Sequence, residues 1–95
     1  MPTYVILSEL DPKAMRDPSE FRQLAETVAK KIREQCPNVR LKESYALMGR
    51  FDVIDIIEAD NPTDVEKVAM IIRCYGHAMT ETLHATPWKD FLSQL

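Results

Sequence analysis

The feature that most constrains the fold of this chain is the segment LMGRFDVIDIIEA at residues 47–59. A glycine turn there precedes a hydrophobic strand that carries two acids, Asp52 and Asp55. Side chains alternate between the two faces of a strand, and in this strand both faces are largely apolar. The strand therefore needs cover on both sides. Each acid needs a partner or a chemical role, because an unpaired carboxylate in apolar surroundings is costly.

The elements around this strand follow the order βαββαβ. Short β-branched runs bounded by turn residues predict strands over residues 3–10, 39–47, 51–59 and 77–86. The second and third strands are close enough to form a hairpin around Gly49. Helical spacing of apolar residues predicts a helix between the first two strands and another between the last two.

Both helices carry start signals. The first is predicted to begin with Asp17 as its cap and Pro18 at its first position. The second is predicted to begin with a capping box formed by Thr63 and Glu66, and to end on Gly76 in a left-handed conformation.

This element order predicts a ferredoxin-like α+β fold, with a four-stranded antiparallel sheet and two helices on one face. Residues 1–86 would form the domain. In residues 87–95 the apolar side chains recur at helical spacing, which predicts a C-terminal docking helix or tail of the same domain. Its docking surface could be its own sheet edge, the mouth of a pocket or a partner subunit, and we favour the partner.

The opposite sheet face would remain without a helix. Because the 51–59 strand is apolar on that side as well, a single copy would expose a large hydrophobic patch. We therefore expect a homodimer that packs through the helix-free sheet face, in the manner of a dimeric α/β barrel.

Composition excludes several classes of function. The 95 residues carry a net charge of −3, which argues against nucleic acid as a partner. No apolar run reaches the length of about 18 residues that a membrane span needs, and we identify no secretion signal. Two cysteines without metal-ligand spacing are expected to be free thiols in the cytoplasm.

The residues that cofactors need are also scarce. With two glycines in all, the chain offers no glycine-rich phosphate loop. His77 and His84 stand seven apart without acids at ligand spacing, which is a poor metal signal. We expect neither a cofactor nor a metal.

The run Gly49-Arg50-Phe51-Asp52, followed by VIDIIEA, resembles the turn motif of the GYD domain family. The opening MPTYVIL and the TETL run at residues 80–83 are similar to that family too, so the resemblance covers residues 1–86. Phe51 stands where the family often has tyrosine. The resemblance implies a ferredoxin-like dimeric fold, but it implies no particular reaction.

The predicted hairpin register assigns a partner to each acid. A two- or four-residue loop places Tyr45 opposite Asp52 and Lys42 opposite Asp55, although a slip of one residue would invert the faces. We expect Asp55 to form an ion pair with Lys42, or with Lys42 or Arg40 of a partner subunit. Asp52 is expected to accept backbone N–H groups of the turn, or else to hold a ligand together with Tyr45.

Further candidate residues lie outside the hairpin. Arg16 precedes a helix N-terminus, where an anion could bind, although a solvated loop is the simpler interpretation. His84, Thr80 and Thr82 share one side of the last strand. If that side faces a pocket, His84 is the best acid or base in the chain. The ligand-binding candidates are thus Tyr45, Asp52, Arg16, Thr80 and Thr82, and the catalytic candidates are His84, Asp55 and Tyr45.

Three hypotheses of function follow. The first is a small homodimer that binds a small ligand or acts as an accessory or regulatory subunit, with a pocket between the sheet and the helices or near the dimer seam. The second is a cofactor-independent oxygenase or isomerase acting on a small acidic organic substrate. The third is a structural interaction module.

Overall fold

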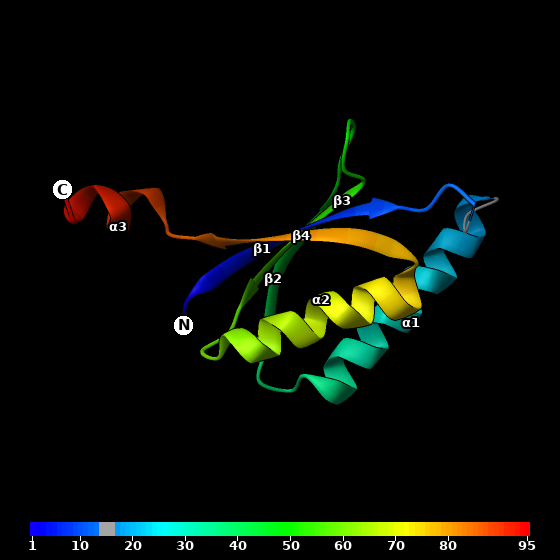
Figure 1. Ribbon diagram of the computed structural model, residues 1–95, viewed down its shortest axis with the longest axis horizontal. Coiled ribbons are helices and arrows are strands. Elements are labelled where there is room, and N and C mark those ends of the chain that lie inside the picture. The colour runs from blue at the N-terminus through cyan, green and yellow to red at the C-terminus, as the bar shows by residue number, and fades with distance from the viewer. Residues whose placement is uncertain (14–16) are drawn as a thin grey trace.

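Four antiparallel strands form one sheet in the order β2-β3-β1-β4, and the two long helices lie on one face of it (Figure 1). The computed structural model describes residues 1–13 and 17–95. The predicted ferredoxin-like α+β fold is confirmed. The elements are β1 (Thr3–Leu10), α1 (Pro18–Gln35), β2 (Arg40–Ala46), β3 (Val53–Glu58), α2 (Pro62–Gly76), β4 (Ala78–Ala85) and α3 (Trp88–Ser93).

The two helix starts differ in how well they were predicted. Asp17 caps α1 as expected, because its carboxylate accepts the N–H groups of Ser19 and Glu20 at 2.9 and 3.1 Å. The predicted capping box of α2 is wrong. Asn61 is the cap, and its side-chain oxygen accepts the N–H of Thr63 at 3.0 Å.

The end of α2 lies one residue later than predicted. His77 adopts the left-handed conformation, with φ 50°, whereas Gly76 is the last helical residue. Gly76 is buried between the two helices, where an added Cβ would lie 3.3 Å from Cγ2 of Val28. The glycine therefore serves the close approach of α1 and α2.

A β-bulge in β2 changes the register of the hairpin. Beyond the shift between Leu41 and Glu43, Ser44 pairs with Asp55 and Tyr45 pairs with Ile54. The predicted pairing of Tyr45 with Asp52 is therefore wrong. The extra residue moves every later partner along the strand, as bulges do.

The hydrophobic core lies between α2 and the sheet. Ile6 of β1 is fully buried, and Ile57 of β3 is 2% exposed. Five apolar residues of α2 are buried in addition to Gly76, namely Val65, Val68, Ala69, Ile71 and Ile72.

The other sheet face has no helix over it in the part of the chain that the structure describes. Its centre is apolar, since Val5 stands opposite both Ile56 and Leu83. Leu83 is 46% exposed and Met79 is 71% exposed. A single copy thus presents the hydrophobic patch that the sequence predicted.

The C-terminal segment forms the predicted helix but does not dock on its own domain. α3 projects beyond the end of β4, away from α1 and α2 (Figure 1). Trp88 stacks on Phe91 at 5.7 Å between ring centroids, yet Trp88 stays 71% exposed. α3 therefore does not dock on its own sheet edge, which was one of the three predicted surfaces.

Candidate functional site

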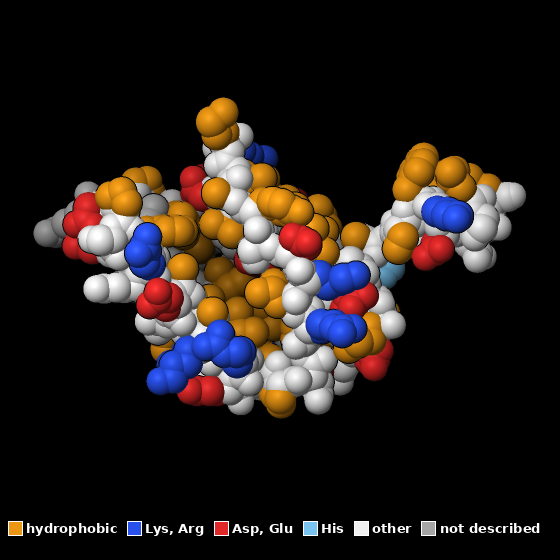
Figure 2. Space-filling view, turned by 180° about the vertical axis from the view of Figure 1, so that it is seen from behind, with side chains coloured by type: hydrophobic (Ala, Val, Ile, Leu, Met, Phe, Trp, Pro, Cys, Tyr) orange, Lys and Arg blue, Asp and Glu red, His pale blue; other side chains and the backbone are white. Residues whose placement is uncertain are grey.

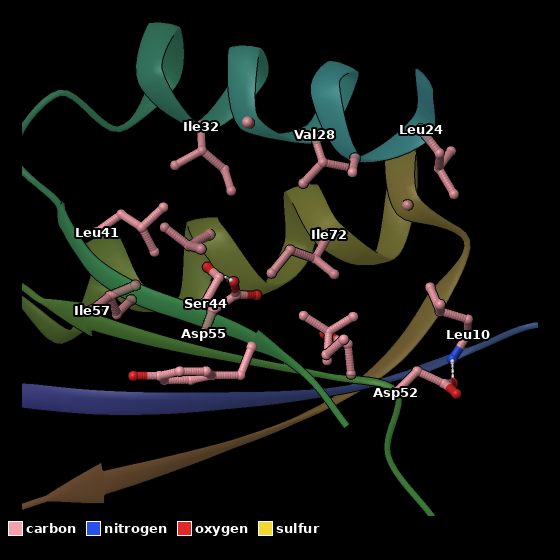
Figure 3. A pocket seen from close by; sticks show the side chains of 18 of the residues that line it. Leu10, Leu24, Val28, Ile32, Leu41, Ser44, Asp52, Asp55, Ile57 and Ile72 are labelled. Atoms are coloured by element: carbon pink, nitrogen blue, oxygen red, sulfur yellow. Dashed lines mark hydrogen bonds between the residues drawn. The ribbon is translucent and has the colours of Figure 1, made fainter. Parts of the chain in front are cut away.

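A cavity of about 620 Å³ lies between α1 and the half of the sheet formed by β2 and β3. Figure 2 shows a hollow lined by hydrophobic side chains, and Figure 3 shows residues that line the cavity. Its walls are mostly aliphatic, and they are supplied by α1, α2 and the sheet; they include Leu24, Val28, Ile32, Leu41, Ile57 and Ile72.

The cavity exists because α1 is held by α2 and not by the sheet. The close contact at Gly76 brings the two helices together. None of the 18 residues of α1, all within the described part of the chain, is buried. Its apolar stripe, formed by residues such as Leu24 and Val28, therefore faces open space above β2 and β3.

Asp55 is the principal polar group in this cavity. The hydroxyl of Ser44 donates a hydrogen bond to Oδ1 of Asp55 at 2.6 Å. Burial raises the pKa of the Asp55 carboxyl above its usual range, although the hydrogen bond from Ser44 acts in the opposite direction. The side chain is thus a carboxylate with a weak neutral partner in an apolar setting.

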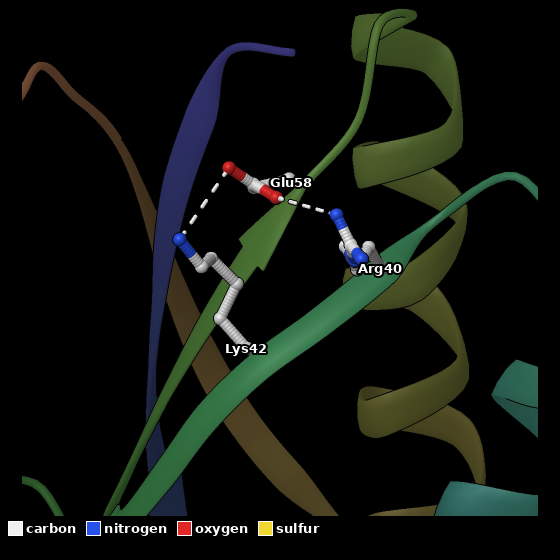
Figure 4. Close-up of polar contacts among 3 residues, drawn as sticks. All are labelled: Arg40, Lys42 and Glu58. Atoms are coloured by element: carbon white, nitrogen blue, oxygen red, sulfur yellow. Dashed lines mark ion pairs between the residues drawn. The ribbon is translucent and has the colours of Figure 1, made fainter.

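The predicted ion pair between Asp55 and Lys42 is wrong. Lys42 approaches Glu58 at 3.6 Å instead, and Arg40 approaches the same carboxylate at 3.9 Å (Figure 4). The register of the hairpin is the physical reason, because it places Ser44 opposite Asp55, two residues from the predicted pairing. The bulge at residues 41–43 accounts for one of those two residues.

Asp52 has the structural role that was expected, but with another partner. Its Oδ2 accepts the N–H of Leu10 at 2.8 Å, and its own N–H donates to the carbonyl of Ser8 at 2.8 Å (Figure 3). The side chain therefore ties the start of β3 to β1, whereas the backbone carbonyl of Asp52 closes the turn by accepting the N–H of Leu47 at 2.8 Å. Its side chain also borders the cavity, so it remains near the ligand site.

Ser8 was not among the predicted site residues. It lines the cavity from β1 and is 1% exposed. Among the described residues its hydroxyl has no hydrogen-bond partner. The signals for Ser8 and Ser44 in the sequence are slight, because each serine stands next to a glutamate in its own strand.

The structure does not group the other predicted site residues with Asp55. Tyr45 borders the cavity from β2, but its register opposite Ile54 assigns its side chain to the face away from Asp55. A hydrogen bond to Glu43 raises the pKa of the Tyr45 phenol. Arg16 lies outside the described residues.

The candidates on β4 do not line the cavity. The hydroxyl of Thr80 accepts a hydrogen bond from Nε of Arg73 at 2.8 Å, and Thr82 is exposed. His84 is exposed beside Tyr4, with 5.3 Å between ring centroids. Because β1 lies between β3 and β4, the structure does not bring His84 together with Asp55. The three catalytic candidates therefore do not share one site.

Both cysteines are free, as predicted. Cys36 lines the cavity and is 2% exposed, and burial raises the pKa of its thiol. A raised pKa keeps the thiol protonated, which makes it a poor nucleophile.

The described residues contain no group of three or more His, Cys, Asp or Glu side chains placed to hold a metal ion. None of the described helices is long and apolar enough to cross a membrane.

Comparisons with known proteins place this chain among small proteins of the same size. The model of the GYD domain family matches residues 4–95. A relative from Thermus thermophilus is 24% identical over 99 residues, covering 100% of this chain and 99% of the relative. That protein is named glutamine synthetase and cystathionine beta-lyase binding protein.

Solved structures share the fold. The crystal structure of hypothetical protein PHS023 from Pyrococcus horikoshii has a TM-score of 0.58 at 25% identity, over 92% of each chain. The protein FFRP-DM1 has a TM-score of 0.57 at 25% identity, over 90% of this chain and 100% of its own. The leucine response regulatory protein of Mycobacterium tuberculosis has a TM-score of 0.63 at 11% identity. This chain covers 51% of that protein, and the likeness concerns the fold alone.

Proposed function

Because this chain belongs to the GYD domain family, and a shared fold does not specify one reaction, we propose its function from its cavity. We propose that it is a homodimeric accessory protein that binds a small ligand between α1 and the sheet. The observation that carries this proposal is the cavity of about 620 Å³. Sites for small molecules are typically apolar and of this size, with a few polar groups that orient the ligand.

The arrangement of titratable groups supports binding over catalysis. An acid–base reaction needs a group with a suitable pKa within reach of the reacting atom. Asp55 lies in the cavity, but His84 lies on β4, outside the set of cavity residues. The oxygenase or isomerase hypothesis is therefore less well supported, because one of its three candidate residues lies outside the cavity.

The accessory role is supported by the relative from Thermus thermophilus, whose name describes the binding of two enzymes. That relative matches this chain along its whole length. We propose that a metabolic enzyme is the protein partner, and that the cavity ligand modulates the association. Sedimentation of a mixture with purified glutamine synthetase tests this directly.

The dimer is supported by the apolar helix-free face. Val5, Ile54, Ile56 and Leu83 lie near its centre, where exposure to water is unfavourable. A specific interface of this kind buries about 800 Å² per partner. The four apolar residues of α3 and the tail would then find cover on the partner subunit.

Charge substitution tests the dimer. Ile54→Lys places a charge at the centre of the proposed interface and should give monomers by light scattering at tens of micromolar. Met70→Lys is the matched control, because Met70 is 55% exposed on α2. It should remain dimeric. A monomeric mass for the unmodified protein at this concentration contradicts the proposal.

Deletion of residues 87–95 tests the docking of α3. The truncated protein should melt at a lower temperature and dissociate at a higher concentration than the full chain. The fluorescence of Trp88 should shift to the red on dilution, as the dimer separates. Identical melting, together with the emission of a fully solvated indole at all concentrations, rules out docking on the partner.

A further inference from the structure

The carboxylate of Asp55 lacks a cationic partner among the described residues, and this indicates what kind of ligand the cavity takes. The two basic residues nearest to it in β2, Arg40 and Lys42, both pair with Glu58. Ser44 supplies one neutral hydrogen bond to Oδ1. An ionised carboxylate can accept more hydrogen bonds than one hydroxyl provides.

The hydroxyl of Ser8 supplies a second, independent observation. It lines the same cavity, is 1% exposed and has no partner within the described part of the chain. Ser8 pairs with Val53 and is therefore a diagonal neighbour of Asp55 on the same sheet face. A buried polar group without a partner is uncommon in folded proteins and needs an explanation.

The remaining lining is mostly apolar, and its other polar members are Arg33, Tyr45 and Asp52. Leu24, Val28 and Ile32 face the strands from α1, and Ile72 contributes from α2 (Figure 3). A ligand that fills this space must therefore have a hydrocarbon body. Its polar end must meet Asp55 at the sheet, since that is where the unmatched negative charge lies.

On the basis of the proposed ligand-binding function, we infer that the cavity binds an apolar molecule ending in a primary amine, with the ammonium group on Asp55. The ammonium donates to the Asp55 carboxylate, and its remaining protons reach the hydroxyl oxygens of Ser44 and Ser8. A charged hydrogen bond of this kind is about twice as strong as a neutral one. A ligand ending in a carboxylate would instead meet like charge at the same point.

Three probes with one hydrocarbon body and different ends test this inference. We propose 4-phenylbutylamine, 4-phenylbutanol and 4-phenylbutyrate, titrated into the full chain and followed by calorimetry and by amide chemical shifts. The amine should bind at least tenfold more tightly than the carboxylate, with the alcohol between them. Shifts should concentrate on Ser44, Asp55 and the α1 residues facing the cavity.

Variants separate the role of Asp55 from a general attraction of cations to an acidic protein. Asp55→Asn should abolish the preference for the amine over the alcohol. Asp60→Asn removes an exposed carboxylate outside the cavity and should leave the preference unchanged. Ala29→Phe fills the cavity from α1 and should abolish the binding of all three probes.

The outcomes distinguish this inference from the proposed function. If the alcohol or the carboxylate binds as tightly as the amine, or if Asp55→Asn keeps the preference, the cavity is a ligand site but the amine assignment is wrong. If no probe binds and native mass spectrometry of the purified protein finds no ligand, the proposed function fails as well. If deleting residues 87–95 strengthens all three probes equally, the occupant is α3 of a second copy, and the amine assignment falls.

Discussion

The two long helices of this protein are both amphipathic, yet only α2 is packed as a core helix. Six residues of α2 are buried, whereas none of the 18 residues of α1, all of them described, is buried. Both helices lie over the same sheet face (Figure 1). The difference shows that an apolar stripe predicts which side of a helix turns inward, but not whether it meets a packed surface or a cavity.

The difference in packing between α1 and α2 originates in their contact at Gly76. Without a Cβ at that position, α1 approaches α2 closely at Val28. α2 in turn packs on the sheet through residues such as Val68, which is 1% exposed. α1 is thereby held near the middle of its apolar stripe while the space above β2 and β3 stays open.

The largest expected effect comes from truncating one residue in each helix. Ile71→Ala removes a side chain that is 6% exposed and should cost about 2–4 kcal/mol of unfolding free energy. Leu24→Ala removes a half-buried side chain that borders the cavity and should cost about 1 kcal/mol or less. Urea denaturation of both variants measures the difference. Equal losses would mean that α1 is packed as tightly as α2.

A smaller effect is expected when a side chain is enlarged in each helix. Ala69→Leu on α2 inserts three carbons at a site that is 8% exposed, and overpacking there should cost about 1–3 kcal/mol. Ala29→Leu on α1 extends into the cavity and should change the free energy by less than about 1 kcal/mol, while it weakens ligand binding. Denaturation curves and probe titrations check the two parts separately. A large loss for Ala29→Leu would contradict an open cavity.

The smallest expected effect is the pH dependence of stability that Asp55 contributes. Burial raises its pKa in the folded protein above the ordinary 3.8, so its folded state holds the proton more firmly than the unfolded state. The resulting stabilisation is complete below pH 3.8 and is lost as the pH rises through the folded pKa. The stability of Asp55→Asn relative to the unmodified protein should therefore increase as the pH rises from 3.8 through the folded pKa of Asp55, and then level off.

Asp17 at the start of α1 acts in the opposite sense. Hydrogen bonds from the Ser19 side chain and the Glu20 N–H lower its pKa, so its contribution is present above 3.8 and is lost as the pH falls through the folded value. The unmodified protein and Asp55→Asn both keep Asp17. The contribution of Asp17 to the pH dependence of stability therefore cancels in the difference between them. A difference curve that falls with rising pH would show that Asp55 is stabilised in its ionised form.

Much of the fold could be predicted from the sequence because local signals and periodicity agree. Asp17 and Pro18 mark a helix start by their own chemistry, and Gly49, with φ 133°, marks the hairpin turn in the same way. The β-branched run at residues 53–58 correctly indicated a strand, and its apolar side chains on both faces are the basis of the dimer prediction. These features depend on neighbours along the chain.

The candidate site could be predicted only in part. Asp55 was identified because a carboxylate in an apolar strand is unusual wherever the strand is placed. Its partner was not, because the register that puts Ser44 in place of Lys42 opposite Asp55 depends on how two strands and their loop settle against each other. A shift of two residues in register is invisible in the sequence and still exchanges an ion pair for a neutral hydrogen bond.

By itself, then, the sequence determined the elements, their order and the positions of the two acids, since each follows from side-chain chemistry within a few residues. Only the tertiary structure decided that β1 separates the strand of His84 from the strand of Asp55, and that α1 leaves a cavity above β2 and β3. Strand order and helix spacing arise from packing between segments far apart in the chain. Local sequence patterns do not specify the distances between such segments.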